Sequence, residues 1–251
     1  MVVAVAVIAA VFLTIGPVPQ DPGYHNFADM RPFFGISNFQ NVVSNLSFLI
    51  IGAIGLGYTW RYSQQVCIAG LETAYSVCFA GVFLTAFGSA YYHFEPSNDA
   101  LVWDRLPMTV AFAGLFAVIV GEFVSVRAAR ILLVPLLILG FMSVEYWAWT
   151  EARGAGDLRP YAIVQFLSML LILFILASHP SVTPQKYVFW WMIGFYLLAK
   201  LCEYFDFAIF ALGNVISGHA LKHIVASLTP GMLLFALMLR RRTGDPCGHD
   251  N

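Results

Sequence analysis

The sequence predicts an all-α protein that crosses a membrane several times. The 251 residues are 60% hydrophobic and only 11% charged, whereas a soluble domain averages about 25% charged residues. The mean hydropathy is +0.77. Aromatic residues make up 16% of the chain, which is typical of helices anchored at both faces of a bilayer. Apolar runs of about 20 residues, the length that spans a bilayer as a helix, recur along the chain.

Eight such runs are candidate membrane spans. They cover residues 2–18, 39–60, 69–92, 101–126, 130–149, 160–178, 186–212 and 217–239. The first run lacks the basic residues that open a cleaved signal peptide, and Pro17 and Pro19 end it without a convincing cleavage site. We therefore favour an uncleaved anchor helix over a signal peptide. The run at 186–212 is longer than a bilayer requires, so we expect it to be tilted or partly embedded.

The runs predict one membrane domain over residues 19–242. An anchor helix or signal-like segment, 1–18, precedes it, and a disordered tail, 243–251, follows it. With both termini in the cytoplasm, the inner loops and the tail carry seven basic residues and the outer loops carry four. This excess favours cytoplasmic termini. The polar segment from Pro19 to Asn38 then lies outside, where we expect it to cover the nearby helix ends.

Charge and cysteine content exclude several classes of function. The net charge of −1 provides no basic surface for nucleic acid. The four cysteines are scattered without C-x-x-C spacing, so they indicate neither a disulfide framework nor a thiolate zinc site. Nothing in the sequence points to an obligate protein partner.

Five polar residues near the predicted helix ends form the candidate site. His219 and His223 are four residues apart, which places them on one face of a helix, as in zinc motifs built on H-x-x-x-H. Ser89 and His93 repeat this spacing at the end of an earlier run, and Asp104 follows His93 by eleven residues. In the orientation above, all five face the outer leaflet. We predict that the three histidines bind one metal ion, with Ser89 and Asp104 beside it.

This arrangement suggests a catalytic zinc site. Three histidines and one water form an open site, whereas structural zinc takes four protein ligands. Zinc lowers the pKa of its water towards about 7. Asp104 would accept the proton of that water, and Ser89 would donate a hydrogen bond to an oxyanion.

Simpler interpretations of the same residues remain open. The histidines can be packed or interfacial side chains, Asp104 can pair with Arg105, and Ser89 can serve close helix packing. Ionisable residues at membrane depth are usually functional, however, and this favours the metal site.

Further charged residues lie within the spans. Lys200 and Glu203 have the spacing of an ion pair on one helix face. Asp206, near them, is either part of a structural ion-pair group or a second-shell residue of the metal. Glu122 is expected to be solvated at the inner surface.

Taken together, these motifs resemble the alkaline ceramidase family. The matching residues are Ser89-x-x-x-His93, Asp104 eleven residues later, and His219-x-x-x-His223 in the last span. Asn41-Val42-Val43-Ser44-Asn45 is similar to the N-T-V-S-N of ceramidases. The likeness extends from about Asp21 to Leu239. The family belongs to a superfamily of seven-helix membrane hydrolases that includes the adiponectin-receptor-like proteins.

The resemblance implies a seven-helix bundle that holds zinc through His93, His219 and His223. It implies hydrolysis of the amide bond of ceramide to a sphingoid base and a fatty acid, with Asp104 as proton acceptor and Ser89 as oxyanion partner. The run at 2–18 would be an addition to this core. The compact chain resembles a bacterial member, which would lie in the inner membrane with its metal site towards the periplasmic leaflet. The substrate would then be ceramide or another lipid amide or ester.

The calcium site of eukaryotic members is only partly matched. Their motif is D-x-x-E-x-N. Asp21 and Asn26 keep this spacing, but Tyr24 replaces the glutamate, and Asn38 stands where a later acidic residue is expected. Losing two carboxylates weakens a site for a hard cation. We therefore expect at most a weak calcium site at Asp21, Asn26 and Asn38, unless Asp29 compensates.

Two other functions compete with lipid amide hydrolysis. The same zinc chemistry would cleave an acyl ester of a phospholipid. Alternatively, the protein is a lipid-binding receptor with a structural metal that binds its ligand without cleaving it.

Overall fold

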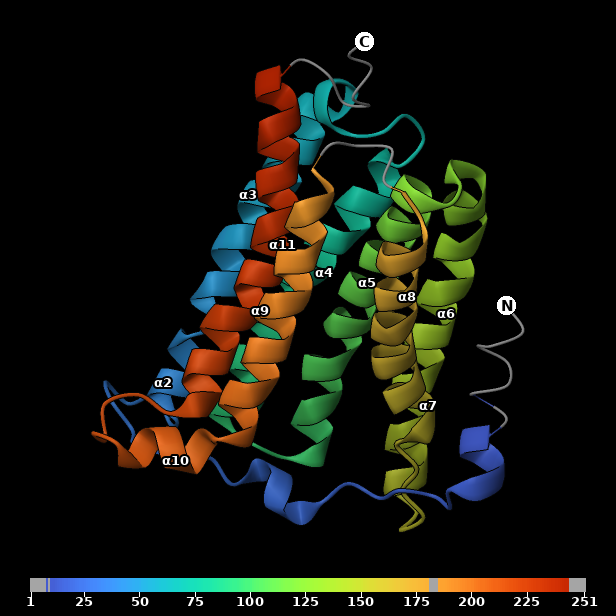
Figure 1. Ribbon diagram of the computed structural model, residues 1–251. Coiled ribbons are helices and arrows are strands. Elements are labelled where there is room, and N and C mark those ends of the chain that lie inside the picture. The colour runs from blue at the N-terminus through green and yellow to red at the C-terminus, as the bar shows by residue number, and fades with distance from the viewer. Residues whose placement is uncertain (1–7, 9, 181–184, 244–251) are drawn as a thin grey trace.

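A computed structural model describes residues 8, 10–180 and 185–243. Within these residues the regular secondary structure is helical, apart from one isolated bridge between Phe33 and Ile36, and turns and irregular segments connect the helices. The long helices lie side by side as a bundle (Figure 1). They are α3 (Leu46–Val66), α4 (Glu72–Phe94), α5 (Asn98–Phe123), α6 (Val126–Glu151), α9 (Lys186–Tyr204) and α11 (Gly218–Thr243).

One further rod completes the bundle. It consists of α7 (Arg159–Ala162), the π-helical η2 (Ile163–Leu167) and α8 (Ser168–Ser178) in succession. The short elements are η1 (Pro22–His25), α2 (Phe39–Val43) and α10 (Asp206–Ala211). The η1 segment and α10 lie across the end of the bundle at which α11 begins (Figure 1).

Six stretches of the described chain are long and apolar enough to cross a membrane. They are Phe39–Val66, Glu72–Phe94, Asn98–Phe123, Val126–Glu151, Arg159–Ser178 and Gly218–Thr243. The outer face of α6 exposes large apolar side chains, among them Ile131, Val134 and Ile138. An extended apolar surface of this kind suits lipid better than water. The predicted all-α, multi-pass membrane bundle is therefore confirmed.

The run at 186–212 is not a single span. The chain turns at Phe205, so that α9 ends at Tyr204 and α10 begins at Asp206. The start of α11 presses against this corner, because a Cβ atom at Gly218 would lie only 2.2 Å from the carbonyl oxygen of Cys202. The side chain of Asp206 accepts the backbone N–H of His219 at 2.7 Å, which holds the corner in place.

The predicted N-terminal helix, 2–18, lies partly outside the described residues, which omit 1–7 and 9. Residues 10–14 are helical, and the helix has ended by Ile15. The chain then reaches the start of α7, where the N–H of Leu158 donates to the carbonyl of Val18 at 2.8 Å. At the other end, α11 continues to Thr243, and the predicted tail from 244 onward lies outside the described residues.

Glycines allow α4 and α5 to pack in direct backbone contact. A Cβ atom at Gly81 would lie 2.2 Å from the backbone nitrogen of Ala111, and one at Gly88 would lie 1.9 Å from the carbonyl oxygen of Trp103. Small residues permit such close approach between membrane helices. The Gly88 contact is the one that matters for the site, because Ser89 and Asp104 are the next residues on the two helices.

A buried polar cluster locks the opposite end of the bundle. Arg240 of α11 forms an ion pair with Glu122 of α5 at 2.7 Å, and both side chains are 0% exposed. The other guanidinium nitrogen of Arg240 donates to the hydroxyl of Tyr75 on α4 at 2.8 Å. Tyr75 also donates to Glu122. The expectation that Glu122 is solvated is therefore wrong, because Arg240 compensates its charge inside the bundle.

Candidate metal centre

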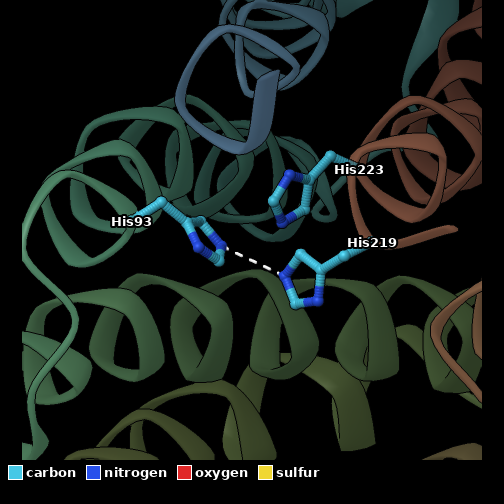
Figure 2. A group of neighbouring side chains, drawn as sticks. All are labelled: His93, His219 and His223. Carbon is cyan, nitrogen blue, oxygen red and sulfur yellow. Dashed lines mark hydrogen bonds between the residues drawn. The ribbon is translucent and has the colours of Figure 1, made fainter. Parts of the chain in front are cut away.

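Three histidines from two helices meet at the end of the bundle where α11 begins. His93 lies in the last turn of α4, and His219 and His223 lie in the first two turns of α11. All three are buried, and one nitrogen from each ring lies within 4.8 Å of the others. Figure 2 shows the rings turned towards one another, with the Nε2 atoms of His93 and His219 3.3 Å apart. The predicted convergence of the three histidines is confirmed.

The surrounding hydrogen bonds fit a bound metal ion. The hydroxyl of Ser44 lies 2.8 Å from Nδ1 of His223, which leaves Nε2 of that ring for an ion. Such a bond to the other ring nitrogen is usual for metal-binding histidines. Three imidazole nitrogens are a set of ligands that suits zinc, and also copper, iron or nickel. The residues present therefore fit a metal ion, and its identity is a separate question.

Lys222 adds a positive charge beside the histidines. Its Nζ atom lies 3.0 Å from Nε2 of His219 and 2.9 Å from a carboxylate oxygen of Glu203. Glu203 also pairs with Lys200 at 2.8 Å. The predicted pairing of Lys200 with Glu203 is confirmed, and Lys222 is an additional partner.

Ser89 and Asp104 lie together on neighbouring helices, as expected. The hydroxyl of Ser89 interacts with the carboxylate of Asp104, and the contact of Gly88 with Trp103 holds the two helices close enough for this. Both residues line the same cavity as His223. The structure thus brings the predicted polar residues to one place.

The cavity has a volume of about 340 Å³, within the usual range for small-molecule sites. Its polar end combines charged and hydroxyl-bearing residues with the edge of the histidine cluster. Most of its remaining wall is apolar. The apolar lining includes Phe48, Val82, Met108, Phe112, Leu115, Phe166 and Ala226. This shape accommodates a molecule with one polar part and one hydrocarbon part.

The segment before α2 covers the histidines. The ring of Phe27 is 4% exposed and lies 4.8 Å from the His93 ring and 4.6 Å from the His219 ring, measured between centroids. This confirms the expected covering role of residues 19–38. His25, in the same segment, lies within hydrogen-bond distance of Tyr92 and Asn98 and is not part of the metal cluster.

Asp206 supports the cluster through the backbone. Its two carboxylate oxygens accept the N–H of His219 at 2.7 Å and the N–H of Ala28 at 2.9 Å. It therefore fixes the start of α11 against the covering segment. Asp206 thus contacts the main chain of a residue in the histidine cluster, and its role as a second-shell residue of a metal ion stays a prediction.

The residues proposed for calcium have separate local contacts. The carboxylate of Asp21 accepts the N–H of Gly23 at 2.8 Å, whereas the amide of Asn38 donates to the carbonyl of His93 at 2.9 Å. Asn26 follows η1 as its C-terminal cap. Calcium binding at these residues stays a prediction.

Asp29 is engaged by its own arginine partner. The side chain of Arg31 hydrogen-bonds the Asp29 carboxyl at 2.8 Å and holds its pKa below the usual range. This ion pair occupies the carboxylate that might otherwise compensate for the missing calcium ligands.

Sequence reasoning missed two residues at the centre. Ser44 lies inside the segment that resembles the ceramidase N-T-V-S-N. That resemblance could have indicated a place for Ser44 at the site. Lys222 lies three residues after His219, on the same helix face, but its charge suggested a helix end. Comparison with protein-family models and with curated proteins found no match to the chain. The family resemblance therefore rests on the motif residues alone.

Proposed function

We propose that the protein is a zinc-dependent intramembrane hydrolase of the alkaline ceramidase type, which cleaves the amide bond of ceramide or a related lipid amide. One observation carries this proposal. A buried cluster of three histidines adjoins a largely apolar cavity that also presents a paired serine and aspartate, Ser89 and Asp104. Polar groups at one end and hydrocarbon walls beyond them match a lipid with its scissile bond near the head.

His93, His219 and His223 would hold the zinc ion, which supplies Lewis acidity and lowers the pKa of nearby water. Asp104 acts as general base and accepts the proton of the attacking water. Ser89 donates a hydrogen bond to the carbonyl oxygen as negative charge develops there. As the new C–O bond forms and the C–N bond breaks, Asp104 returns the proton to the departing amine.

The cavity walls position the substrate for this chemistry. The apolar lining binds the acyl chain by removing its surface from water, at roughly 25 cal/mol per Å². Phe27 covers the histidines on the other side, which limits access of bulk water. A substrate held in this way presents its carbonyl to Ser89 and Asp104.

The membrane spans and the distribution of basic residues support a proposed location. We propose a bacterial inner-membrane protein with cytoplasmic termini and the metal centre towards the periplasmic leaflet, as the excess of basic residues in the inner loops favours. The lipid substrate would then enter from the bilayer.

The test is hydrolysis of a fluorescent ceramide by detergent-purified protein. We expect cleavage that stops on addition of a zinc chelator. Asp104→Asn should abolish turnover and leave metal content unchanged, whereas Asp99→Asn, at an exposed position of the same helix, should behave as wild type. Full activity in Asp104→Asn would refute its role as the base.

A phospholipid substrate is tested alongside ceramide. Release of fatty acid from phospholipid only would assign the same centre to ester hydrolysis. Tight binding of ceramide without cleavage of either lipid, in zinc-loaded protein, would identify a receptor and refute the proposed hydrolase.

A further inference from the structure

Arg105 is a buried cation that the proposed chemistry does not use. It follows Asp104 on α5, is only 5% exposed, and lines the same cavity. A buried arginine usually has a carboxylate partner, because an uncompensated charge away from water is unfavourable by several kcal/mol. Arg240, at the other end of the bundle, has such a partner in Glu122.

Arg105 is held in place by neutral groups. One guanidinium nitrogen, Nη2, donates to the side-chain carbonyl of Gln20 at 2.7 Å. The guanidinium carbon lies 4.0 Å from the ring centroid of Trp147 and 4.8 Å from that of Tyr161. Aromatic faces stabilise a cation without neutralising it. Its orientation is therefore fixed while its charge is kept.

The other terminal nitrogen of Arg105 has no partner. Across the described ranges, Nη1 is buried without a hydrogen-bond acceptor, and no carboxylate lies within 4 Å as an ion-pair partner. Buried N–H groups are rarely left in this condition, and each such group calls for an explanation. A ligand oxygen in the cavity would provide one.

The charges around the cavity favour an anion. Its lining includes three cations, Arg105, Lys200 and Lys222, but only two carboxylates, Asp104 and Glu203. Lys200 and Lys222 share the single carboxylate of Glu203. With neutral histidines, the charged side chains of the lining therefore sum to an excess of positive charge. Lys200 and Lys222 have Glu203 as an ion-pair partner, whereas Arg105 has no such partner among the described residues.

We propose that Arg105 binds an oxyanion, a phosphate or a carboxylate, in the head of the lipid substrate. This inference rests on the proposed function and narrows its substrate class to acidic lipid amides. The planar guanidinium suits both groups, since its N–H donors match paired oxygens. A hydroxyl of a neutral head group can accept a hydrogen bond from Nη1, but it leaves the charge of Arg105 uncompensated.

The experiment measures binding separately from cleavage. Chelator-treated protein keeps the probes intact and removes any contribution of a metal ion to anion binding. Dissociation constants are measured in micelles for ceramide 1-phosphate, N-oleoylglycine and the neutral N-oleoylethanolamine. We expect the wild type to bind at least one acidic probe about 10- to 100-fold more tightly than the neutral one, as a charge-assisted hydrogen bond predicts. Comparison of the first two probes distinguishes phosphate from carboxylate, and competition by inorganic phosphate tests whether the lipid part is needed.

Variants connect the preference to Arg105. Arg105→Gln should reduce the acidic preference to near unity, and Arg105→Lys, which keeps the charge, should retain part of it. The matched control is Arg153→Gln, because Arg153 is exposed and also lies over a tryptophan, 4.1 Å from the Trp149 ring. Unfolding midpoints identify any variant that fails to fold, and the lysine variant then carries the test.

Two results would overturn the inference. They are equal wild-type affinity for the acidic and neutral probes, and an acidic preference that survives in Arg105→Gln. Cleavage of neutral ceramide without any acidic preference would count against this inference alone. Acidic preference without cleavage by zinc-loaded protein would count against the proposed hydrolase alone.

Discussion

The two ends of the bundle each bury a polar cluster, and α4 and α11 contribute to both. At one end, Tyr75, Glu122 and Arg240 hydrogen-bond to one another, and the opposite charges of Glu122 and Arg240 are in contact. At the other end, the histidines present ring nitrogens to one another at the edge of a cavity. The first cluster neutralises itself, whereas the second could hold a metal ion.

This difference separates a structural role from a functional one. A self-neutralised cluster fixes the register of three helices and leaves nothing for a substrate to bind. A cluster whose donors and acceptors face a cavity is unfavourable for folding alone, so its presence points to a bound partner. The following experiments test that separation, from the largest expected effect to the smallest.

Removing a histidine should abolish function without unfolding the protein. His93→Ala should lose bound metal and bring ceramide turnover below detection, because two imidazoles do not complete the site. Its unfolding free energy, compared with chelator-treated wild type, should change by about 1 kcal/mol or less. The control is His25→Ala, outside the cluster, which should keep its metal. Normal metal content in His93→Ala would refute the metal-binding role assigned to the histidine cluster.

Removing the carboxylate of Glu122, at the other end of the bundle, should lower stability and leave metal binding unchanged. Glu122→Ala leaves Arg240 as a buried charge and should destabilise the protein by about 3–5 kcal/mol, measured by denaturation in micelles. Metal bound per folded molecule should not change. Replacing both partners, Glu122→Leu with Arg240→Met, should recover most of the loss.

The exposed Glu95 provides the control for that experiment. Glu95→Ala should change stability by no more than about 0.5 kcal/mol. Loss of metal from folded Glu122→Ala protein would show that the two ends are not independent.

The hydrogen bond from Ser44 should strengthen zinc binding without being required for it. Ser44→Ala removes the hydrogen bond to Nδ1 of His223 and should weaken zinc affinity by about 10- to 100-fold, measured by competition with a chelating dye. Ser227→Ala is the matched control, because that buried hydroxyl donates to the carbonyl of Ile224 in its own helix. Equal effects of both variants would refute a specific role for Ser44.

Separating α4 from α5 should have the smallest effect on the histidine cluster itself, because neither Gly88 nor Trp103 belongs to it. Gly88→Ala places a Cβ atom against the Trp103 carbonyl and should destabilise the protein by about 1–3 kcal/mol. It should also lower turnover, since Ser89 and Asp104 move apart. Gly57→Ala, with nothing within 4 Å of the added atom, should be neutral or slightly stabilising. Unchanged turnover in folded Gly88→Ala would show that this spacing is not critical.

The sequence predicted local patterns well and pairings across the bundle poorly. The spacing of His219 and His223 predicts one helix face, and the histidine cluster follows once His93 joins them from another helix end. Glu122 looked like a solvated residue, because its partner Arg240 is 118 positions away and sits in a basic tail. The corner at Phe205 was also missed, since it depends on Asp206 binding the start of α11. Such contacts are set by tertiary packing and leave no periodic signal.

The most direct test of the central claim is a zinc titration of chelator-treated protein, followed by metal content and by ceramide hydrolysis in the same sample. The account predicts that activity returns in proportion to zinc, saturates at about one ion per chain as expected for a single three-histidine site, and does not return in His219→Ala. Failure of the wild type to bind zinc would contradict it.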